Sequence, residues 1–452
     1  MESVALIVDP EPEYAPDIIG HYWHRAGLRS VLAYSSRKKR VAAMVNAPIV
    51  HSRAIAGHIS FEEKAPVPES VANIVTQLAG EFDVRVVPTY LEDFVILTTA
   101  LSARFGLDWN PPEVMAPYRN KFAYKERVRM NRPDLHLNAF KTVLTADDVL
   151  DSDPTEYSRF VLKPIDGIGN RDILIRDWPP DRDEIAAYLK DLGSVAVLEE
   201  FMSGQEYQVS GQVVGDGEPV VTAIWQANRG AVGSRLNISE DYWTIATSDP
   251  RFGQLAEYAR DVVRASGLTR SPFHMELILR DSGPGLIECG ARLIGGAGWH
   301  EDARMHGPQC DLLGAAAHYW LSDEPYELGL DWAHYDSLVG VRVFGNGTEG
   351  GHVVAVHGVE ELERTPGFLN WIQKPRVGQE VWPTVSTATT QWSFNLATAN
   401  HEQSERLVAK ARSEIRTELA SEGWPVKAAA IRRTTRLAKK AVTNYFAGRR
   451  MR

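Results

Sequence analysis

Apolar runs alternate with amphipathic segments over the first hundred residues. Val4–Asp9 (VALIVD) is a short apolar run that ends in Asp-Pro, which indicates a buried strand of a parallel sheet. Further strand or helix patterns cover residues 18–26, 31–34, 71–88 and 91–105. This alternation predicts an α/β domain with a mostly parallel sheet that ends near residue 112.

The middle of the chain carries a different pattern, with short apolar runs separated by turn signals. A basic helical stretch (Tyr118–Met130) precedes the strand RFVLKP (Arg159–Pro164), a glycine-containing turn and the strand DILIRD (Asp172–Asp177). Five more predicted strands read AVLEEFM, EYQVSGQVV, PVVTAIWQ, FHMELIL and GLIECG. They predict a largely antiparallel sheet. The polar, glycine-bearing segment Ala227–Pro250 is expected to be a connection that closes over substrates or a surface loop, with Arg229, Arg235 and Trp243 on it.

These patterns predict a multidomain fold, α/β at the start and α+β beyond it. The expected divisions are residues 1–112, 113–195, 196–330, a β-rich region at 331–420 and a basic helical tail at 421–452. The tail favours an amphipathic helix docked on the acidic body or on a second subunit. Contact with an anionic membrane or a nucleic acid is the alternative.

Composition and charge narrow the classes of function. The 452 residues are 44% hydrophobic with a formal charge of −10, which argues against a general nucleic-acid binder. No signal peptide and no membrane span are expected, so the cytoplasm is the expected location. Cys289 and Cys310 are the two cysteines, too few for a disulfide framework or a four-cysteine zinc site.

Candidate chemistry is densest in FHMELILRDSGPGLIECGARLIGG (Phe273–Gly296). The pattern places Glu276 and Glu288 on two adjacent antiparallel strands within apolar flanks. Buried ionised carboxylates are costly unless they are paired, so the hairpin predicts a site for a divalent cation such as Mg²⁺. Two unrelated surface acids are the alternative.

Two earlier segments suit a nucleotide. Lys163 ends an apolar strand and precedes a turn with Gly167 and Gly169, so an ammonium and free backbone N–H groups can meet a phosphate chain. The strand end Leu198–Met202 can offer backbone groups to an adenine edge, and Glu206 can accept from ribose hydroxyls. A solvated lysine and a strand with acidic ends are the alternatives.

The residues after the hairpin are candidates for the chemistry and for the substrates. Arg292 can neutralise charge on an acyl phosphate, or it pairs with a nearby acid. The glycine run is followed by three candidates for an acceptor site, Trp299, His300 and Arg304. An ordinary helix start with polar neighbours is the alternative. Cys289 is expected to be a core residue.

The order of these pieces resembles the ATP-grasp superfamily, and within it the L-amino-acid (dipeptide) ligases. The matching segments, within a resemblance that covers about residues 1–400, are RNKFAYKERV (Arg119–Val128), FVLKPIDGIGN, VLEEFMSGQEYQVSG, the Phe273–Gly296 hairpin and HGPQCDLL (His306–Leu313). The resemblance implies an ATP-grasp fold preceded by a parallel α/β pre-ATP-grasp domain. Residues 113–195 would be the lid with the phosphate-binding loop, and 196–330 the part with the metal site.

The resemblance also implies a role for each matching residue. Lys121 and Lys163 would bind the ATP phosphates, and Glu206 would hold the ribose. Glu199, Glu200 and Met202 would line the adenine. Glu276 and Glu288 would ligate magnesium, and Arg292 would stabilise the acyl phosphate. Gly290 stands where the family usually has asparagine, so one metal ligand is missing and the number of ions, one or two, stays open.

The activity implied is an ATP-dependent ligase that joins a carboxylate to an amine through an acyl phosphate. Its expected partners are small molecules of the amino-acid type, with ATP and Mg²⁺ as cofactors and Mn²⁺ as the alternative ion. A homodimer is one of the assemblies that stay open. An ATP-grasp carboxylase, a ligase of nucleotide metabolism and a non-catalytic nucleotide-binding regulator are the alternatives.

Overall fold

The structure is a computed structural model of the chain. It describes residues 1–9, 22–36, 53–62, 65–107, 110–167, 172–215, 217–233, 235–295 and 298–420. The predicted basic tail at 421–452 and Gly169 therefore lie outside the described residues.

The first part of the chain forms a four-stranded sheet in the order β3-β2-β1-β4, in which every neighbouring pair is parallel. Its strands are β1 (Glu2–Val8), β2 (Arg29–Ser35), β3 (Ile55–Phe61) and β4 (Phe82–Val86). The helices α3 (Val67–Leu78) and α4 (Val95–Arg104) follow β3 and β4. Apolar side chains of these strands and helices form one core cluster, which includes Leu6, Ile74 and Leu101. The predicted parallel sheet is confirmed, although the pattern did not indicate β3.

A short connection and one helix lead to a second sheet. The connection contains α5 (Pro112–Met115) and η4 (Ala116–Arg119), and the helix is α6 (Lys121–Asn131); η3 (Glu92–Phe94) lies earlier, between β4 and α4. Asn120 caps α6, because its side chain accepts a hydrogen bond from the Ala123 N–H at 2.9 Å. The sheet has the order β5-β8-β6-β7 and is antiparallel.

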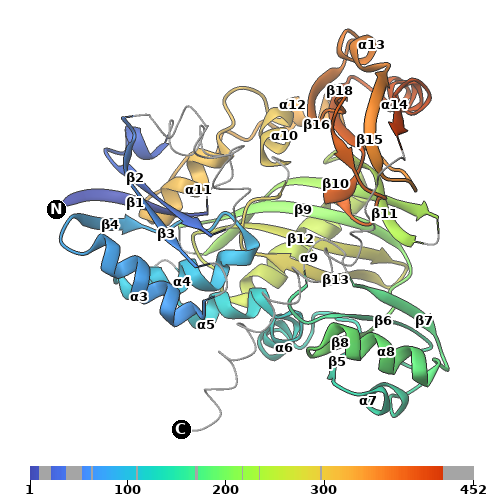
Figure 1. Cartoon of the computed structure of the whole chain (residues 1–452), viewed down its shortest axis with the longest axis horizontal. Coiled ribbons are helices and arrows are strands. Elements are labelled where there is room, and N and C mark those ends of the chain that lie inside the picture. Colours follow the sequence, from blue (N-terminus) through green and yellow to red (C-terminus); the bar gives the residue numbers. More distant parts are fainter. Residues whose placement is uncertain are drawn as a thin grey trace.

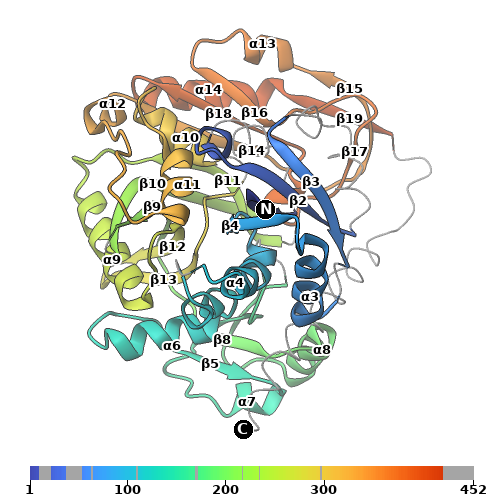
Figure 2. The same ribbon diagram turned by 90° about the vertical axis from the view of Figure 1, so that its left-hand side faces the viewer.

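This second sheet is small and carries its own apolar core. Its strands are β5 (Phe140–Val143), β6 (Arg159–Pro164), β7 (Leu174–Asp177) and β8 (Ala196–Glu200), with the helices α7 (Ala146–Leu150) and α8 (Arg182–Leu192). Phe160, Leu162, Ile185 and Leu189 are among the buried residues that join strands to helices. In Figure 1 the sheet lies at the lower right of the molecule, and in Figure 2 it lies beside α6.

An antiparallel sheet of eight strands forms the centre of the molecule, in the order β13-β12-β9-β10-β11-β14-β18-β16 (Figure 1). Its strands are β9 (Gln205–Val214), β10 (Glu218–Val232), β11 (Arg235–Thr244), β12 (Pro272–Arg280), β13 (Gly283–Gly290), β14 (Val339–Gly345), β16 (Phe368–Gln373) and β18 (Trp392–Thr398). The helix α9 (Pro250–Ser266) packs on β9, β10, β12 and β13, and α10 (Gly298–Met305) and α11 (Leu312–Leu321) follow β13. The sheet continues across residue 330, where a division was predicted, and that division stays a prediction.

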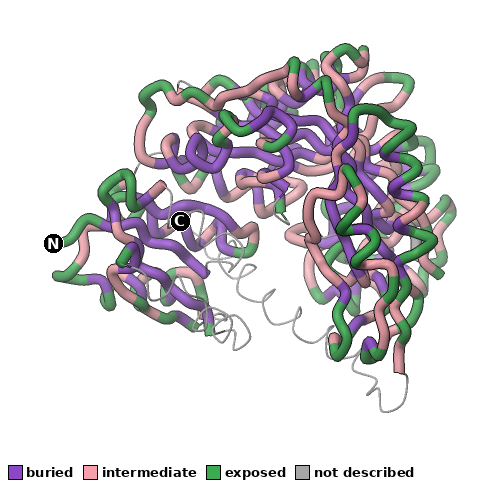
Figure 3. The backbone as a smooth tube through the Cα atoms, turned by 90° about the horizontal axis from the view of Figure 1, so that it is seen from above, coloured by how far each residue is buried: buried purple, intermediate pink, exposed green. Residues whose placement is uncertain are grey.

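The last described region adds a small sheet with the order β17-β15-β19. It consists of β15 (Gly351–His357), β17 (Glu380–Val381) and β19 (Arg416–Ala420), and the short helices α12 (Trp332–Asp336), α13 (Val359–Glu363), η5 (Thr387–Thr389) and the longer α14 (His401–Glu414) complete the chain. Burial is concentrated along the inner strands, and exposed positions follow the outer turns and helices (Figure 3). Among the described residues, no helix is long and apolar enough to span a membrane.

One expectation about secondary structure is wrong. The segment Ala227–Pro250 was expected to be a connection, but most of it belongs to β10 and β11, which pair from Trp225↔Thr244 to Val232↔Arg235. Several of the polar side chains that suggested a loop have partners within the sheet. Asn228 Nδ2, for example, donates to Asp241 Oδ1 at 2.7 Å. A strand tolerates polar residues when their hydrogen bonds are satisfied.

Candidate active site

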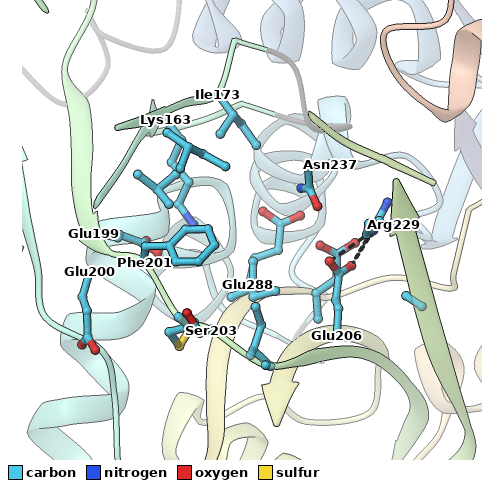
Figure 4. A pocket seen from close by; sticks show the side chains of 18 of the residues that line it. Lys163, Ile173, Glu199, Glu200, Phe201, Ser203, Glu206, Arg229, Asn237 and Glu288 are labelled. Atoms are coloured by element: carbon cyan, nitrogen blue, oxygen red, sulfur yellow. Dashed lines mark hydrogen bonds and ion pairs between the residues drawn. The ribbon is translucent and has the colours of Figure 1, made fainter. Parts of the chain in front are cut away.

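A cavity of about 490 Å³ lies between the small β5–β8 sheet and the central sheet. Its lining includes nine of the residues predicted for ATP and metal: Lys121, Lys163, Gly167, Glu199, Glu200, Met202, Glu206, Glu276 and Glu288. Figure 4 shows several of them pointing toward the cavity from opposite sides. Residues more than 160 positions apart in the chain therefore meet in one place, as the resemblance implied.

A buried group of two lysines and one glutamate lies at the end of β6. Glu199 Oε2 is 3.0 Å from Lys163 Nζ and 2.9 Å from Lys125 Nζ. Burial acts to raise the pKa of Glu199, but the two lysines outweigh it and lower that pKa to about 2. Glu199 is thus a constant anion that orients Lys163.

Lys125 was missed by the sequence analysis. It lies four residues after Lys121 on α6, so both side chains leave the same face of the helix. That spacing in KFAYK is the signal that could have identified it. Lys121 itself reaches two parts of the site, because its Nζ donates to the Gly167 carbonyl oxygen at 2.6 Å and lies 2.8 Å from Glu288 Oε2.

The strand end after β8 provides the side of the cavity expected to receive adenine. Met202 is buried there, and the Glu200 carboxylate lies 3.6 Å from Arg280 Nη1. The turn that follows requires glycine at position 204, where φ is +155° and a Cβ would lie 2.2 Å from the Leu279 carbonyl oxygen. The chain therefore passes β12 closely before it enters β9.

The two predicted metal ligands face each other. Glu276 and Glu288 are direct cross-strand partners on β12 and β13. Burial, and after it the neighbouring Glu288 and Glu206 carboxylates, raises the pKa of Glu276 to about 8. Two acids held together in this way repel each other, and a cation between them removes the repulsion.

This donor set fits a magnesium ion. Within the part of the chain that the structure describes, no group of three or more His, Cys, Asp and Glu side chains could hold a metal. Mg²⁺ commonly takes only one or two carboxylates and completes its shell with phosphate and water oxygens. The Glu276–Glu288 pair therefore suits an ion brought in with a nucleotide.

Gly290 has room for the missing side chain. The three atoms nearest to a Cβ at this position would all belong to the Arg292 side chain, at 3.6 to 3.8 Å, which is ordinary van der Waals contact. We predict that Gly290→Asn is tolerated and lowers the Mg²⁺ concentration for half-maximal activity by about tenfold, because it adds an amide oxygen ligand. Titration of ADP release with Mg²⁺ checks this. Gly290→Ala is the matched control, and an equal response of the two variants would contradict the prediction.

Arg292 is held by a residue from the first part of the chain. Its Nη2 and Nε lie 2.6 and 3.2 Å from Glu92 Oε2, and Glu92 Oε1 accepts from Arg119 at 2.9 Å. Burial favours a raised pKa for Glu92, but Arg292 and Arg119 lower it to about 2. Glu92 was not predicted, because it lies 200 residues from Arg292.

The remaining candidates lie on or near α10, and none of them lines the cavity. Trp299 is buried and stacks on His300 with ring centroids 3.5 Å apart, whereas Arg304 is exposed and lies 3.4 Å from Glu301. Their roles toward a substrate stay predictions. Cys289 is buried, which raises the pKa of its thiol to about 12, as expected of a core residue.

Comparisons with known proteins find a matching domain family, a curated relative and solved structures of the same fold. Residues 159–301 match the ATP-grasp domain family. Dapdiamide A synthase from Enterobacter agglomerans is 29% identical over 217 residues, which are 44% of this chain and 48% of that protein. The chain thus matches about half the length of this relative.

Two solved structures show the same fold over nearly the whole chain. L-amino acid ligase from Bacillus licheniformis has a TM-score of 0.73 at 19% identity and covers 93% of this chain and 99% of its own. N5-carboxyaminoimidazole ribonucleotide synthetase from Thermotoga maritima has a TM-score of 0.62 at 16% identity, and the match covers 93% of this chain and 100% of that structure's chain. Residues 159–301 therefore match the ATP-grasp domain family, and the chain shares the fold of these solved structures over nearly its whole length.

Proposed function

We propose that this chain is an ATP-dependent ligase that joins a carboxylate to an amine, both of the amino-acid type, with release of ADP and phosphate. The observation that carries the proposal is the Glu276–Glu288 pair, which lies in register inside a cavity that Lys121 and Lys163 also line. The names of dapdiamide A synthase and L-amino acid ligase support the substrate class.

In the first step, an oxygen of the substrate carboxylate attacks the γ-phosphorus of ATP. The bond from that phosphorus to the oxygen bridging it to the β-phosphate breaks, so ADP leaves and an acyl phosphate forms. In the second step the amine nitrogen attacks the acyl carbon, the bond from that carbon to the phosphate oxygen breaks, and the nitrogen loses a proton. An amide and inorganic phosphate result.

The side chains of the cavity supply position and charge rather than a nucleophile. Lys163, oriented by Glu199, and Lys121 neutralise phosphate oxygens. Glu276 and Glu288 would hold Mg²⁺, with Mn²⁺ as the alternative, and such an ion would supply positive charge beside the phosphate oxygens. Arg292 stabilises the negative charge of the acyl phosphate and of the tetrahedral state that follows.

We predict that phosphate release requires two amino-acid substrates together with ATP and Mg²⁺. Screening pairs of amino acids for phosphate release, with mass spectrometry of the products, tests this. The expected product has the summed mass of the pair less one water. ADP formation that depends on bicarbonate would favour a carboxylase, and ATP binding without ADP formation in any mixture would favour a regulator. A cytoplasmic location and a homodimer stay predictions.

A further inference from the structure

The glutamate expected to hold the ribose has an arginine partner inside the same cavity. Glu206 on β9 and Arg229 on β10 both line the cavity, and Figure 4 shows their side chains directed at each other. Arg229 Nε lies 3.1 Å from each Glu206 carboxylate oxygen, and Nη2 donates a further hydrogen bond to Oε1. The guanidinium therefore contacts both oxygens.

Arg229 is itself fixed by the neighbouring strand. Its Nη1 donates to Ser239 Oγ on β11, and its guanidinium carbon lies 5.4 Å from the centre of the Tyr242 ring. Ser239 Oγ and the Tyr242 hydroxyl are 2.7 Å apart. The side chains of Arg229 and Glu206 are only 10% and 9% exposed. The carboxylate is thus held from one side by a side chain that has little freedom of its own.

Stability alone does not explain such a pair. Burying two charges costs about as much as their attraction returns, so a buried ion pair is weak evidence for a gain in stability. A planar guanidinium does define the direction of a carboxylate better than an ammonium does. Of the hydrogen bonds from Arg229 to Glu206, Oε1 accepts two and Oε2 accepts one, so acceptor capacity remains on Oε2 for a ligand.

Two of the other acids of the cavity have lysine partners of their own. Glu199 is paired with Lys163, and Glu288 with Lys121. In the cavity Arg229 donates its hydrogen bonds to Glu206, although the charge of Glu276 also acts on it. We propose that Arg229 is a positioning residue that aims Glu206 at the two ribose hydroxyls of ATP and so makes the site select ribonucleotides over deoxynucleotides. This inference rests on the proposed function, since it assumes that the cavity binds ATP.

Direct contact of Arg229 with the phosphates is the competing role, and ligand binding separates the two. Dissociation constants of the full chain for ATP, 2′-deoxyATP, 3′-deoxyATP and adenosine are measured by calorimetry, without any ligation substrate. The wild-type protein should bind ATP about tenfold more tightly than either deoxynucleotide, because each loses a hydrogen bond to a charged group.

In Arg229→Met, the ratio of the deoxynucleotide dissociation constants to that of ATP should fall close to one. The dissociation constants of adenosine and ATP should rise by similar factors. Arg229→Lys should restore part of the preference. Because Arg229→Met leaves Glu206 without its partner, the double variant with Glu206→Gln is also measured, and it should match Glu206→Gln alone. Arg264→Met is the control, since it breaks an exposed ion pair with Glu218 at the far end of the same strand.

A preference for ATP that survives in Arg229→Met would overturn the inference. A loss of affinity for ATP without a loss of affinity for adenosine would also overturn it, because that result would indicate that Arg229 contacts the phosphates. Absence of nucleotide binding in the wild-type protein would overturn both the inference and the proposed function. Normal binding without ligation would overturn the proposed function alone.

Discussion

Glu288→Gln should lower amino-acid-dependent ADP release by more than about 100-fold without loss of protein stability. Changes in groups that merely support a metal ligand typically cost about 10- to 100-fold, and a ligand itself should cost more. Glu288 faces Glu276 across the hairpin and helps to raise the pKa of that residue to about 8, although burial contributes more. The change relieves the repulsion with Glu276 but also removes the Lys121–Glu288 ion pair, while Lys121 keeps the Gly167 carbonyl oxygen as an acceptor, so the Tm should change little.

ADP release at several Mg²⁺ concentrations and a thermal unfolding curve measure the two effects. The variant should need more Mg²⁺ for its residual activity. Glu218→Gln is the matched control, because Glu218 is an exposed glutamate on β10 of the same sheet. Unchanged ADP release in Glu288→Gln would show that the metal assignment is wrong, and a large fall in Tm would show a structural role.

Arg292→Ala should abolish turnover and largely spare ATP binding. Arg292 is not among the residues that line the cavity, and its guanidinium contacts Glu92 at 2.6 Å. Removing one donor to a developing negative charge costs about 10²- to 10³-fold in kcat. Glu92 keeps Arg119 at 2.9 Å in this variant, which limits the cost of removing Arg292.

Phosphate release and calorimetric ATP binding, measured on the same preparation, separate these effects. Arg292→Lys keeps the positive charge but loses the planar set of N–H donors of the guanidinium, so it should retain part of the activity. Glu92→Gln keeps the guanidinium but weakens its support, and should also give an intermediate rate. If Arg292→Ala loses ATP binding along with turnover, the role of Arg292 is structural.

The predicted loop at Ala227–Pro250 shows where reading the sequence failed. Polar residues in a strand are ambiguous, because the pattern does not reveal whether their partners lie in solvent or on the next strand. Asn228 has its partner on β11, and Arg229 has its partner on β9. Arg229 was expected on a loop, but it lies on β10 and contacts Glu206. The sequence indicated that Arg229 could contact a ligand, but it did not indicate that this residue lies on a strand.

Each feature that the sequence alone predicted depends on residues that are near one another in the chain. Glu276 and Glu288 are twelve positions apart in one hairpin, so period-two alternation and a turn signal were enough to pair them. Lys163 followed from an apolar strand and a glycine turn in the same way. The parallel order of the first sheet followed from alternating strands and helices.

Only the tertiary structure decided which distant groups support these residues. Glu92 meets Arg292 across 200 positions, and Lys125 meets Glu199 across 74. Such contacts depend on how separate sheets and helices pack, and no local periodicity encodes them. The sequence thus predicted the groups that we propose for ATP and metal, and the packing of the fold decided which buried charges contact them.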